Sequence, residues 1–362
     1  MTIYMGLMSG TSMDGIDAAL IDVETHRLIG GLTRPYDTEV RDQLMAIATG
    51  MAVTPAYLWQ LHTLLGRQFA AAANDLLRLT KLSVHDVTAI GSHGQTISHD
   101  AAAHIPYTIQ LGCPHTISEL TGLTVVADFR TRDMVIGGQG APFAPLYHQA
   151  LFAGGHPALA VVNMGGIANV TFISKDAPTS GYDTGPGNCL MDAWIQLHKH
   201  QSFDAGGAYA SSGEVIPELL SAMLADDYFK LEPPKSICKS YFSIDWLQAF
   251  LKPNYAPQDV QASLLALTAQ TTVDAILTTP RAVQCVALCG GGAHNTALLH
   301  ELRTLLPQVK VLNTQDLGVD PDFLEAMMFA WLAHQSLTAT RLDLSHITGA
   351  GKPAILGAIY RI

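Results

Sequence analysis

Apolar runs that end in glycine-rich turns recur along this chain. In residues 2–23, an apolar run is interrupted by a small, hydroxyl-rich turn at 9–15 and resumes as alternating apolar and acidic residues. Residues 158–175 repeat that order around a pair of glycines. Two runs separated by a glycine turn are typical of a β-hairpin, so both stretches are predicted to be hairpins. Their similarity indicates two related halves, with both turns facing one cleft.

Other stretches have the spacing of helices. Residues 56–80 and 261–277 place apolar residues at helical intervals. A further helix is predicted to start at Pro321, with Asp320 as its N-cap. Residues 181–200 are expected to form a loop and then a helix. Strands and helices therefore alternate, which predicts an α/β fold whose otherwise parallel sheets contain hairpins.

The length and composition predict two domains. A chain of 362 residues, 48% of them apolar, is too long for one ordinary hydrophobic core. The glycine- and proline-rich stretch at 123–145 suits a domain junction. The first domain is predicted over 1–132 and is expected to be completed by 350–362, and the second is predicted over 133–349.

The charge and the lack of targeting sequences restrict partners and location. A formal net charge of −11 repels a polyphosphate backbone, so nucleic acid is not an expected partner. No apolar run reaches the roughly 18 residues of a membrane span, and no signal peptide is recognised. We therefore expect a cytoplasmic protein without a membrane partner. The five cysteines are scattered and form no CxxC pair, so neither a disulfide framework nor a zinc site is predicted.

Four glycine-containing turns, at 9–15, 91–96, 164–166 and 290–292, each follow an apolar run. Glycine lets backbone N–H groups come close to a phosphate, and hydroxyl groups in the first turn add donors. Neither GxxxxGK[ST] nor a strand–GxGxxG–helix sequence is present. One such turn is more often only a tight turn. Four together favour phosphate binding at hairpins rather than at a P-loop.

Six stretches together resemble the anhydro-N-acetylmuramic acid kinases: GLMSGTSMDGIDAALID, GSHGQT, ADFRTRDMVIGGQGAPFAP, NMGGIANVTFI, YDTGPGN and CGGGAHN. The resemblance extends from residue 5 to the end of the chain. It implies the fold shared by sugar kinases, actin and the 70-kDa heat-shock ATPases, a two-domain α/β fold with the active site in an interdomain cleft. Residues 235–242, KSICKSYF, depart from the KSTGR-type sequence of the family, so the role of 226–240 stays open.

The reaction that this resemblance implies couples hydrolysis to phosphorylation. 1,6-Anhydro-N-acetylmuramic acid, ATP and water give N-acetylmuramic acid 6-phosphate and ADP, during the recycling of cell-wall peptidoglycan. The implied cofactors are ATP and Mg²⁺. The alternatives are a nucleotide-switched binding protein with an actin-like fold, a conventional sugar kinase and a phosphohydrolase. The sequence leaves open whether the chain acts alone or as a homodimer.

The resemblance also assigns nucleotide-binding residues. It matches the first hairpin turn to one phosphate loop, the second hairpin turn to another, and the last glycine turn to the adenosine side of the nucleotide. The residues assigned in this way are Ser9, Gly10, Thr11, Ser12, Met13, Asp14, Gly15, Ile16, Asp17, Asn163, Gly165, Gly166, Gly290, Gly291 and Gly292.

Asp183 is the candidate general base. Water must be aimed at C1 and lose a proton as the anhydro bridge opens, and a carboxylate suits that task. Asp183 precedes a glycine-proline loop, where no regular strand pairing is expected to engage its oxygens. From the sequence alone an aspartate here more often caps its own loop as an Asx turn, and it is the resemblance that favours the base. Glu325 is implied as a second catalytic carboxylate, although an acid near a helix start also suits the helix dipole.

Arg130 and Arg132 are candidates for binding the lactyl carboxylate of a muramic acid, because a guanidinium can bind a carboxylate through two hydrogen bonds. The alternative is ion pairing with Asp128 or Asp133. Arg130 is preferred, but Arg132 is not excluded. Thr96 could hydrogen-bond a hydroxyl or amide group of the sugar.

Asp14 and Asp17 are the acids of the first hairpin turn, where they could hold Mg²⁺ through water molecules. The alternatives are that Asp14 belongs to a simple turn dipeptide and that Asp17 faces solvent. His93 follows an apolar strand and is expected to be a structural residue rather than a catalytic one.

Overall fold

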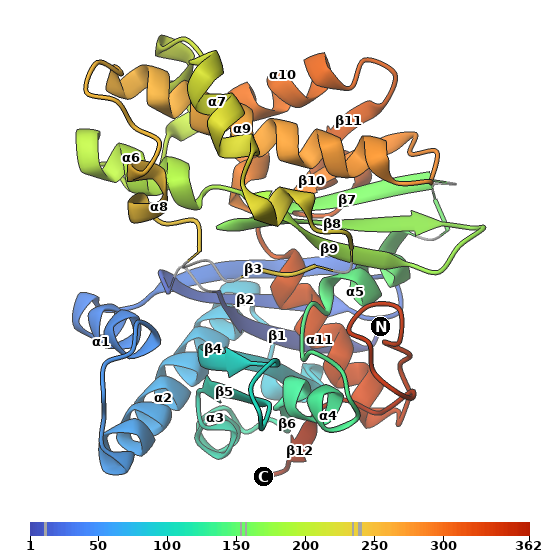
Figure 1. Ribbon diagram of the computed structural model, residues 1–362. Helices are drawn as coiled ribbons and strands as arrows, with labels where there is room; N and C mark the ends of the chain where they lie inside the picture. Colours follow the sequence, from blue (N-terminus) through green and yellow to red (C-terminus); the bar gives the residue numbers. More distant parts are fainter. Residues whose placement is uncertain (11–12, 153, 156–157, 234, 238–240) are drawn as a thin grey trace. The chain divides into compact units, whose positions relative to one another are not determined.

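The chain folds into two compact units, each built around its own sheet (Figure 1). The computed structural model describes residues 1–10, 13–152, 154–155, 158–233, 235–237 and 241–362. The first unit comprises Met1–Tyr147 and Phe323–Ile362, and the second comprises His148–Asp322. These boundaries differ from the predicted 132/133 and 349/350, because a helix within 323–349 packs on the sheet of the first unit.

The first unit contains a mixed sheet in the order β12-β6-β4-β1-β2-β3, with β5 paired to β4. Strand β1 runs antiparallel to β2 and parallel to β4, and β12 pairs with β6 near the end of the chain. The strands are β1 (Ile3–Ser9), β2 (Gly15–Asp22), β3 (Arg27–Pro35), β4 (Ala89–Asp100), β5 (Tyr107–Leu111), β6 (Val125–Ala127) and β12 (Ala358–Tyr360). The predicted hairpin at 2–23 is confirmed as β1 and β2.

Different helices cover the two faces of this sheet. The helices are α1 (Thr38–Ala48), α2 (Pro55–Thr80), η1 (Val84–Asp86), α3 (Pro114–Thr121), α4 (Phe129–Val135) and α11 (Leu324–Leu337), while α5 (Ala144–Phe152) contains the boundary between the units. Met5 and Leu7 enter the core that includes Phe69 of α2. Tyr4, on the alternate face, packs edge-on against His334 of α11.

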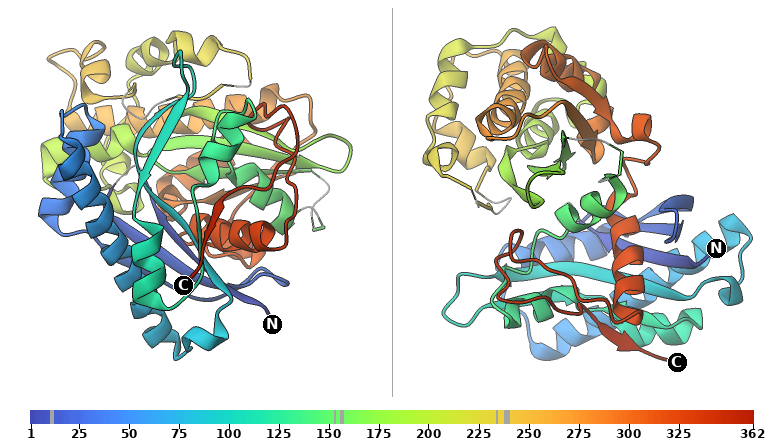
Figure 2. Two further views of the ribbon diagram at one scale, coloured as in Figure 1. Left: turned by 90° about the horizontal axis from the view of Figure 1, so that it is seen from below. Right: turned by 90° about the vertical axis from the view of Figure 1, so that its right-hand side faces the viewer.

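Helix α11 lies against the sheet of the first unit (Figure 2). At the point of contact, both strands beneath the helix have glycine. A Cβ atom at Gly6 of β1 would overlap the carbonyl oxygen of Ala326, and one at Gly91 of β4 would overlap that of Phe329. Gly6 and Gly91 are paired across the two strands. The helix backbone therefore sits directly on this two-glycine surface, which fixes the first turn of α11 and Glu325 within it.

The predicted start of this helix is wrong by about one turn. The helix begins at Leu324 rather than at Pro321, with Phe323 as its N-cap. Asp320 instead accepts a hydrogen bond from the backbone N–H of Asp322, and the carbonyl of Pro321 accepts one from Gly290. Asp320 thus bonds within the turn that precedes the helix, and the Gly290 contact ties that turn to the glycine turn after β10.

The second unit repeats the strand order of the first. Its sheet runs β11-β10-β7-β8-β9. The hairpin β7–β8 corresponds to β1–β2, and the parallel strands β10 and β11 beside β7 correspond to β4 and β6 beside β1. The strands are β7 (Ala158–Met164), β8 (Ile167–Ser174), β9 (Ser180–Pro186), β10 (Cys285–Cys289) and β11 (Lys310–Asn313). The second predicted hairpin is confirmed as β7 and β8, and the equal strand order supports two related halves.

Helices pack on this second sheet around a core that includes Val162, Leu264 and Val286. They are α6 (Cys189–Lys199), η2 (Ala205–Gly207), η3 (Ala210–Ser212), α7 (Pro217–Leu224), η4 (Asp227–Lys230), α8 (Ile244–Gln248), α9 (Pro257–Thr278), η5 (Gly291–His294), α10 (Thr296–Leu305) and η6 (Thr314–Leu317). Within the described ranges, α9 alone is long and apolar enough to cross a membrane. Because 83% of its apolar window is buried in the fold, α9 has the character of a core helix.

Candidate functional site

The first hairpin turn is held from inside by buried polar side chains. The Ser9 hydroxyl lies 2.6 Å from the carbonyl oxygen of Gly15 and 2.7 Å from Oε1 of Gln95. Nε2 of Gln95 donates to the carbonyl oxygen of Gly10 at 3.1 Å. The Ser9 side chain is 1% exposed, so its hydroxyl is engaged within the fold and shapes the turn. The assignments of Thr11 and Ser12 lie outside the described residues.

The two acids of this hairpin differ in their surroundings. Asp14 is exposed, whereas Asp17 is half-buried and accepts a hydrogen bond from the Thr33 hydroxyl at 2.6 Å. Met13, which directly precedes Asp14, has a positive φ of 52°. No group of three or more histidine, cysteine, aspartate or glutamate side chains that could hold a metal occurs in the described part of the chain. Mg²⁺ needs only one or two protein carboxylates when phosphates complete its shell, so these residues fit such a site.

The predicted turn at 91–96 is wrong, because these residues continue strand β4. Gly94, with φ of 76°, allows an irregular register in which Ser9 of β1 pairs with Gln95. Beyond this point, antiparallel pairing with β5 extends strand β4 to Asp100. Thr96 lies on this part of the strand, and its hydroxyl accepts a hydrogen bond from Gln110 at 3.2 Å. The polar motif therefore supports the first hairpin turn from the neighbouring strand.

Arg130 lies near the start of α4 and is held on two sides. Its Nε donates to Nε2 of His93 at 2.9 Å, and its Nη1 donates to the carbonyl oxygen of Gly140 at 3.1 Å. Burial lowers the pKa of the guanidinium to about 10, and the negative charge of Glu325 opposes that shift. Arg130 therefore stays charged at neutral pH, and it lies close enough to Glu325 for an electrostatic interaction between the two side chains. Arg132, by contrast, is exposed.

Asp133 supports the loop that carries Gly140. Its carboxylate accepts hydrogen bonds from the backbone N–H of Gly140 at 2.7 Å and from the Thr348 hydroxyl at 2.8 Å. Burial raises the pKa of Asp133 despite these bonds. In the part of the chain that the structure describes, neither Arg130 nor Arg132 forms an ion pair with Asp128 or Asp133. The alternative explanation for the two arginines is therefore not supported.

In the second unit, the turn between β7 and β8 and the glycine turn after β10 lie together. A Cβ atom at Gly290 would overlap Oδ1 of Asn163, and one at Gly292 would overlap the side chain of Met164. The carbonyl groups of Gly165 and Gly166 accept hydrogen bonds from backbone N–H groups at the start of α6. The structure thus brings together the residues assigned to the second phosphate loop and to the adenosine side.

Asp183 lies on strand β9, so the predicted loop is wrong. Asn163, Asn169 and Asp183 form a row of paired residues across β7, β8 and β9. The backbone N–H of Asp183 donates to the carbonyl of Lys235 at 3.1 Å, and the N–H of Ile237 donates to Oδ2 of Asp183 at 2.9 Å. A distant segment, rather than its own loop, therefore orients this carboxylate, which argues against an Asx turn.

The environment of Asp183 suits a proton acceptor. Burial raises the pKa of its carboxyl to about 6, and the hydrogen bond from Ile237 opposes that shift. Within the described residues, no donor contacts the second oxygen, Oδ1. Among the described residues, one oxygen of Asp183 thus accepts a hydrogen bond and the other does not, and the pKa lies near the pH at which a general base is most effective.

Sequence reasoning missed the partners of Asp183. Besides Ile237, the Tyr228 hydroxyl donates to the carbonyl oxygen of Asp183 at 2.7 Å. The Lys235 ammonium lies 4.7 Å from the centre of the Tyr228 ring, and burial lowers its pKa. The hydrogen bonds from Tyr228 and Ile237 to Asp183 span 45 and 54 positions in the chain, so no local pattern could have indicated them.

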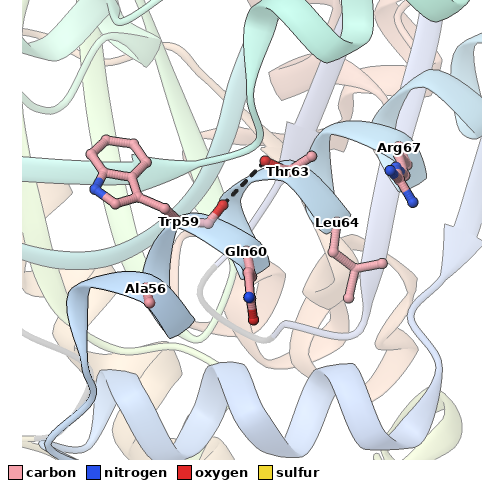
Figure 3. A pocket seen from close by; sticks show the side chains of 6 residues that line it. All are labelled: Ala56, Trp59, Gln60, Thr63, Leu64 and Arg67. Carbon is pink, nitrogen blue, oxygen red and sulfur yellow. Dashed lines mark hydrogen bonds between the residues drawn. The ribbon is translucent and has the colours of Figure 1, made fainter.

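A shallow hollow on the outer face of α2 shares no residue with these sites. Figure 3 shows that its lining comes from successive turns of one helix, and that the Thr63 hydroxyl donates to the carbonyl of Trp59. The lining residues are Ala56, Trp59, Gln60, Thr63, Leu64 and Arg67. It has few converging polar groups, so the predicted chemistry does not belong there.

Comparison with known proteins places the chain in one family. The family model described as anhydro-N-acetylmuramic acid kinase matches residues 2–362. The anhydro-N-acetylmuramic acid kinase of Legionella pneumophila (strain Corby) is 56% identical over 362 residues, covering 100% of this chain and 99% of the relative. The enzyme of the same name from Xylella fastidiosa is 46% identical over 365 residues, covering 99% and 96% of the two chains.

Solved structures show the same fold at much lower identity. Component A of (R)-2-hydroxyglutaryl-CoA dehydratase from Acidaminococcus fermentans superimposes with a TM-score of 0.52 at 10% identity. The match covers 93% of this chain and 100% of that one. At this identity the likeness concerns the fold alone, which is the two-domain α/β fold of the actin-like ATPases.

Proposed function

The chain belongs to the anhydro-N-acetylmuramic acid kinase family, and from that premise we propose which residues perform the reaction. It is an ATP-dependent phosphotransferase for an amino sugar. 1,6-Anhydro-N-acetylmuramic acid, ATP and water give N-acetylmuramic acid 6-phosphate and ADP, a step in peptidoglycan recycling. The observation that carries the residue assignment is the Asp183 carboxylate, with one oxygen fixed by Ile237 and a raised pKa.

Asp183 accepts the proton of the attacking water. The water oxygen forms a bond to C1 while the bond between C1 and O6 breaks, and the proton moves to Oδ1 of Asp183. The freed O6 takes the γ-phosphoryl group as the bond to the leaving ADP oxygen breaks. Glu325 is the second carboxylate, placed by α11 on the sheet that carries the first hairpin turn. Its negative charge beside Arg130 suits a site for the polar sugar.

The nucleotide is bound by backbone groups of the three glycine turns. Phosphoryl transfer depends on positioning and on neutralising charge, and both hairpin turns offer backbone donors for phosphates. The turn at 290–292, packed against Asn163, is assigned to the adenosine side. Asp14 and Asp17 would hold Mg²⁺ through water, and the metal would supply charge neutralisation at the phosphates.

Substrate recognition is assigned to Arg130 and Thr96. Arg130 is charged, half-buried and oriented by two hydrogen bonds, which suits a residue that binds a carboxylate. The Thr96 hydroxyl, which accepts from Gln110, keeps its proton for donation to a sugar oxygen.

Replacing Arg130 with methionine is expected to raise KM for the anhydro sugar about 10–100-fold, because a hydrogen bond to a charged group is worth about 1.5–3 kcal/mol. KM for ATP should change little. The matched control is Arg132→Met, since Arg132 is exposed and should leave both constants nearly unchanged. Steady-state kinetics with each substrate varied decides the matter. A larger effect of Arg132→Met on KM for the sugar would show that Arg132, rather than Arg130, binds the lactyl carboxylate.

The pH dependence of kcat/KM should show an acidic limb governed by Asp183. The base acts only when deprotonated, and its pKa is raised to about 6, so activity should be full above pH 7. Below pH 6 it should fall about tenfold per pH unit, as a single titrating base requires. The binding of an ATP analogue over the same pH range is the control. A rate that stays level down to pH 5 would exclude this assignment.

The reaction itself is tested with ¹⁸O-labelled water and mass spectrometry of the sugar product. Label on the anomeric oxygen, with one phosphate on the sugar per ADP, is the expected result. A phosphorylated sugar without label would indicate a conventional sugar kinase. Label only in free phosphate would indicate a phosphohydrolase. ADP release that responds to a protein partner but not to the sugar would indicate a nucleotide switch.

A further inference from the structure

We propose that His93 is a positioning residue, which orients the Arg130 guanidinium toward the lactyl carboxylate of the substrate. The inference rests on the proposed role of Arg130. The Nε atom of Arg130 donates to Nε2 of His93 at 2.9 Å, while Nδ1 of His93 lies 2.9 Å from the carbonyl oxygen of Gly94. His93 is therefore the only side chain of the described residues that hydrogen-bonds Arg130.

The two hydrogen bonds fix the tautomer of His93. A carbonyl oxygen can only accept, so Nδ1 must carry the proton that points to Gly94. Nε2 then has a free lone pair, which the Nε–H of Arg130 can approach. A second proton on the ring would set two N–H groups against each other, so only neutral imidazole supports this contact.

The surroundings of His93 maintain the neutral form. His93 is 5% exposed, and the Phe329 ring of α11 lies with its centre 4.7 Å from that of the imidazole. Burial holds the pKa of His93 well below its usual range, and the positive charge of Arg130 lowers it further. His93 therefore stays neutral, and an acceptor at Nε2, at neutral pH.

The position of His93 decides which part of the guanidinium is left for a ligand. His93 takes Nε, and the Gly140 carbonyl takes one hydrogen of Nη1. In the described part of the chain, Nη2 has no hydrogen-bond acceptor. Nη1 and Nη2 together form the end of the guanidinium, which can bind both oxygens of one carboxylate. Without His93, the side chain could rotate and lose this alignment.

Asparagine and glutamine separate the two hydrogen bonds of His93. In His93→Asn, the short amide can still donate to Gly94 but cannot reach Arg130. In His93→Gln, the longer side chain can bring an amide oxygen to the place of Nε2. His93→Asn is expected to raise KM for the anhydro sugar about tenfold, while kcat and KM for ATP stay within about twofold, and His93→Gln should restore most of the loss.

Binding of the substrate and of its lactyl methyl ester, measured by calorimetry, tests the link to the carboxylate. Wild type should prefer the acid, and both His93→Asn and Arg130→Met should lose that preference without weaker binding of the ester. If Arg130→Met loses the preference and His93→Asn keeps it, His93 has no positioning role. If Arg130→Met itself keeps the preference, the proposed role of Arg130 is wrong and this inference falls with it.

A folding defect would be recognised by a second variant and a second ligand. His93→Phe fills the same space beside Phe329 without any acceptor. It should lose the acid preference as His93→Asn does, while the affinity for an ATP analogue stays within about twofold. Equal weakening of acid, ester and nucleotide by both variants would show a purely structural residue and would overturn the proposal.

Discussion

Replacing Asp183 with asparagine is expected to lower kcat by about 10²–10⁴-fold, the range that a positioned general base contributes. Asparagine has nearly the same shape, and its amide oxygen can still accept the hydrogen bond from Ile237. The fold and the neighbouring turns should therefore be unchanged. What is lost is the oxygen that takes the proton of water, so turnover should fall while nucleotide binding persists.

The measurement pairs an ADP-release assay with calorimetric binding of a non-hydrolysable ATP analogue. Asp176→Asn is the matched control, because Asp176 is an exposed acid of the same unit and should leave kcat unchanged. Ordinary turnover by Asp183→Asn would remove Asp183 from the mechanism. Loss of analogue binding together with turnover would instead assign Asp183 to the nucleotide site.

Local sequence patterns are sufficient to predict the elements whose backbone hydrogen bonds lie within one segment or between adjacent segments. The hairpins β1–β2 and β7–β8 follow from a glycine turn between two apolar runs, and both are confirmed. The predicted helices at 56–80 and 261–277 are confirmed within α2 and α9. In each case the decisive contacts lie within one segment or between adjacent ones.

Sequence patterns fail where pairing with another strand determines the backbone conformation. Residues 91–96 were predicted to be a turn from their glycines, but pairing with β5 extends the strand through Gly94. YDTGPGN was predicted to be a loop for the same reason, and pairing with β8 makes its first residues part of β9. A glycine can serve a turn or a strand irregularity equally well, and only its neighbours in space distinguish the two.

The candidate site shows the same division. Arg130 and Asp183 were identified by the motifs that contain them, but their orientation depends on His93, Gly140 and Ile237. His93 follows an apolar strand and is therefore expected to be structural, and its contact with Arg130, 37 positions away, is visible only in the structure. Motifs therefore predicted which residues carry the chemistry, whereas the groups that hold them in place required the structure.

The largest expected effect on stability comes from Gly6→Ala. The new methyl group would overlap the carbonyl oxygen of Ala326, and this oxygen belongs to helix backbone that cannot turn aside as a side chain could. Helix α11 must move away from β1, which disrupts its packing over the sheet. We expect the free energy of unfolding to fall by about 3 kcal/mol or more, at or above the upper end of usual overpacking costs. Urea unfolding of the variant measures this change.

Gly154→Ala is the matched control, because a Cβ atom there meets nothing within 4 Å, and its cost should be below about 0.5 kcal/mol. Gly91→Ala should resemble Gly6→Ala, since Gly91 is its partner in β4 and faces the next turn of α11. The double variant should then cost clearly less than the sum of the two single costs, because one displacement of α11 relieves both overlaps. Additive costs would mean that the two glycines accommodate the helix independently. A small cost for either single variant would contradict the close approach of α11, and with it the placement of Glu325.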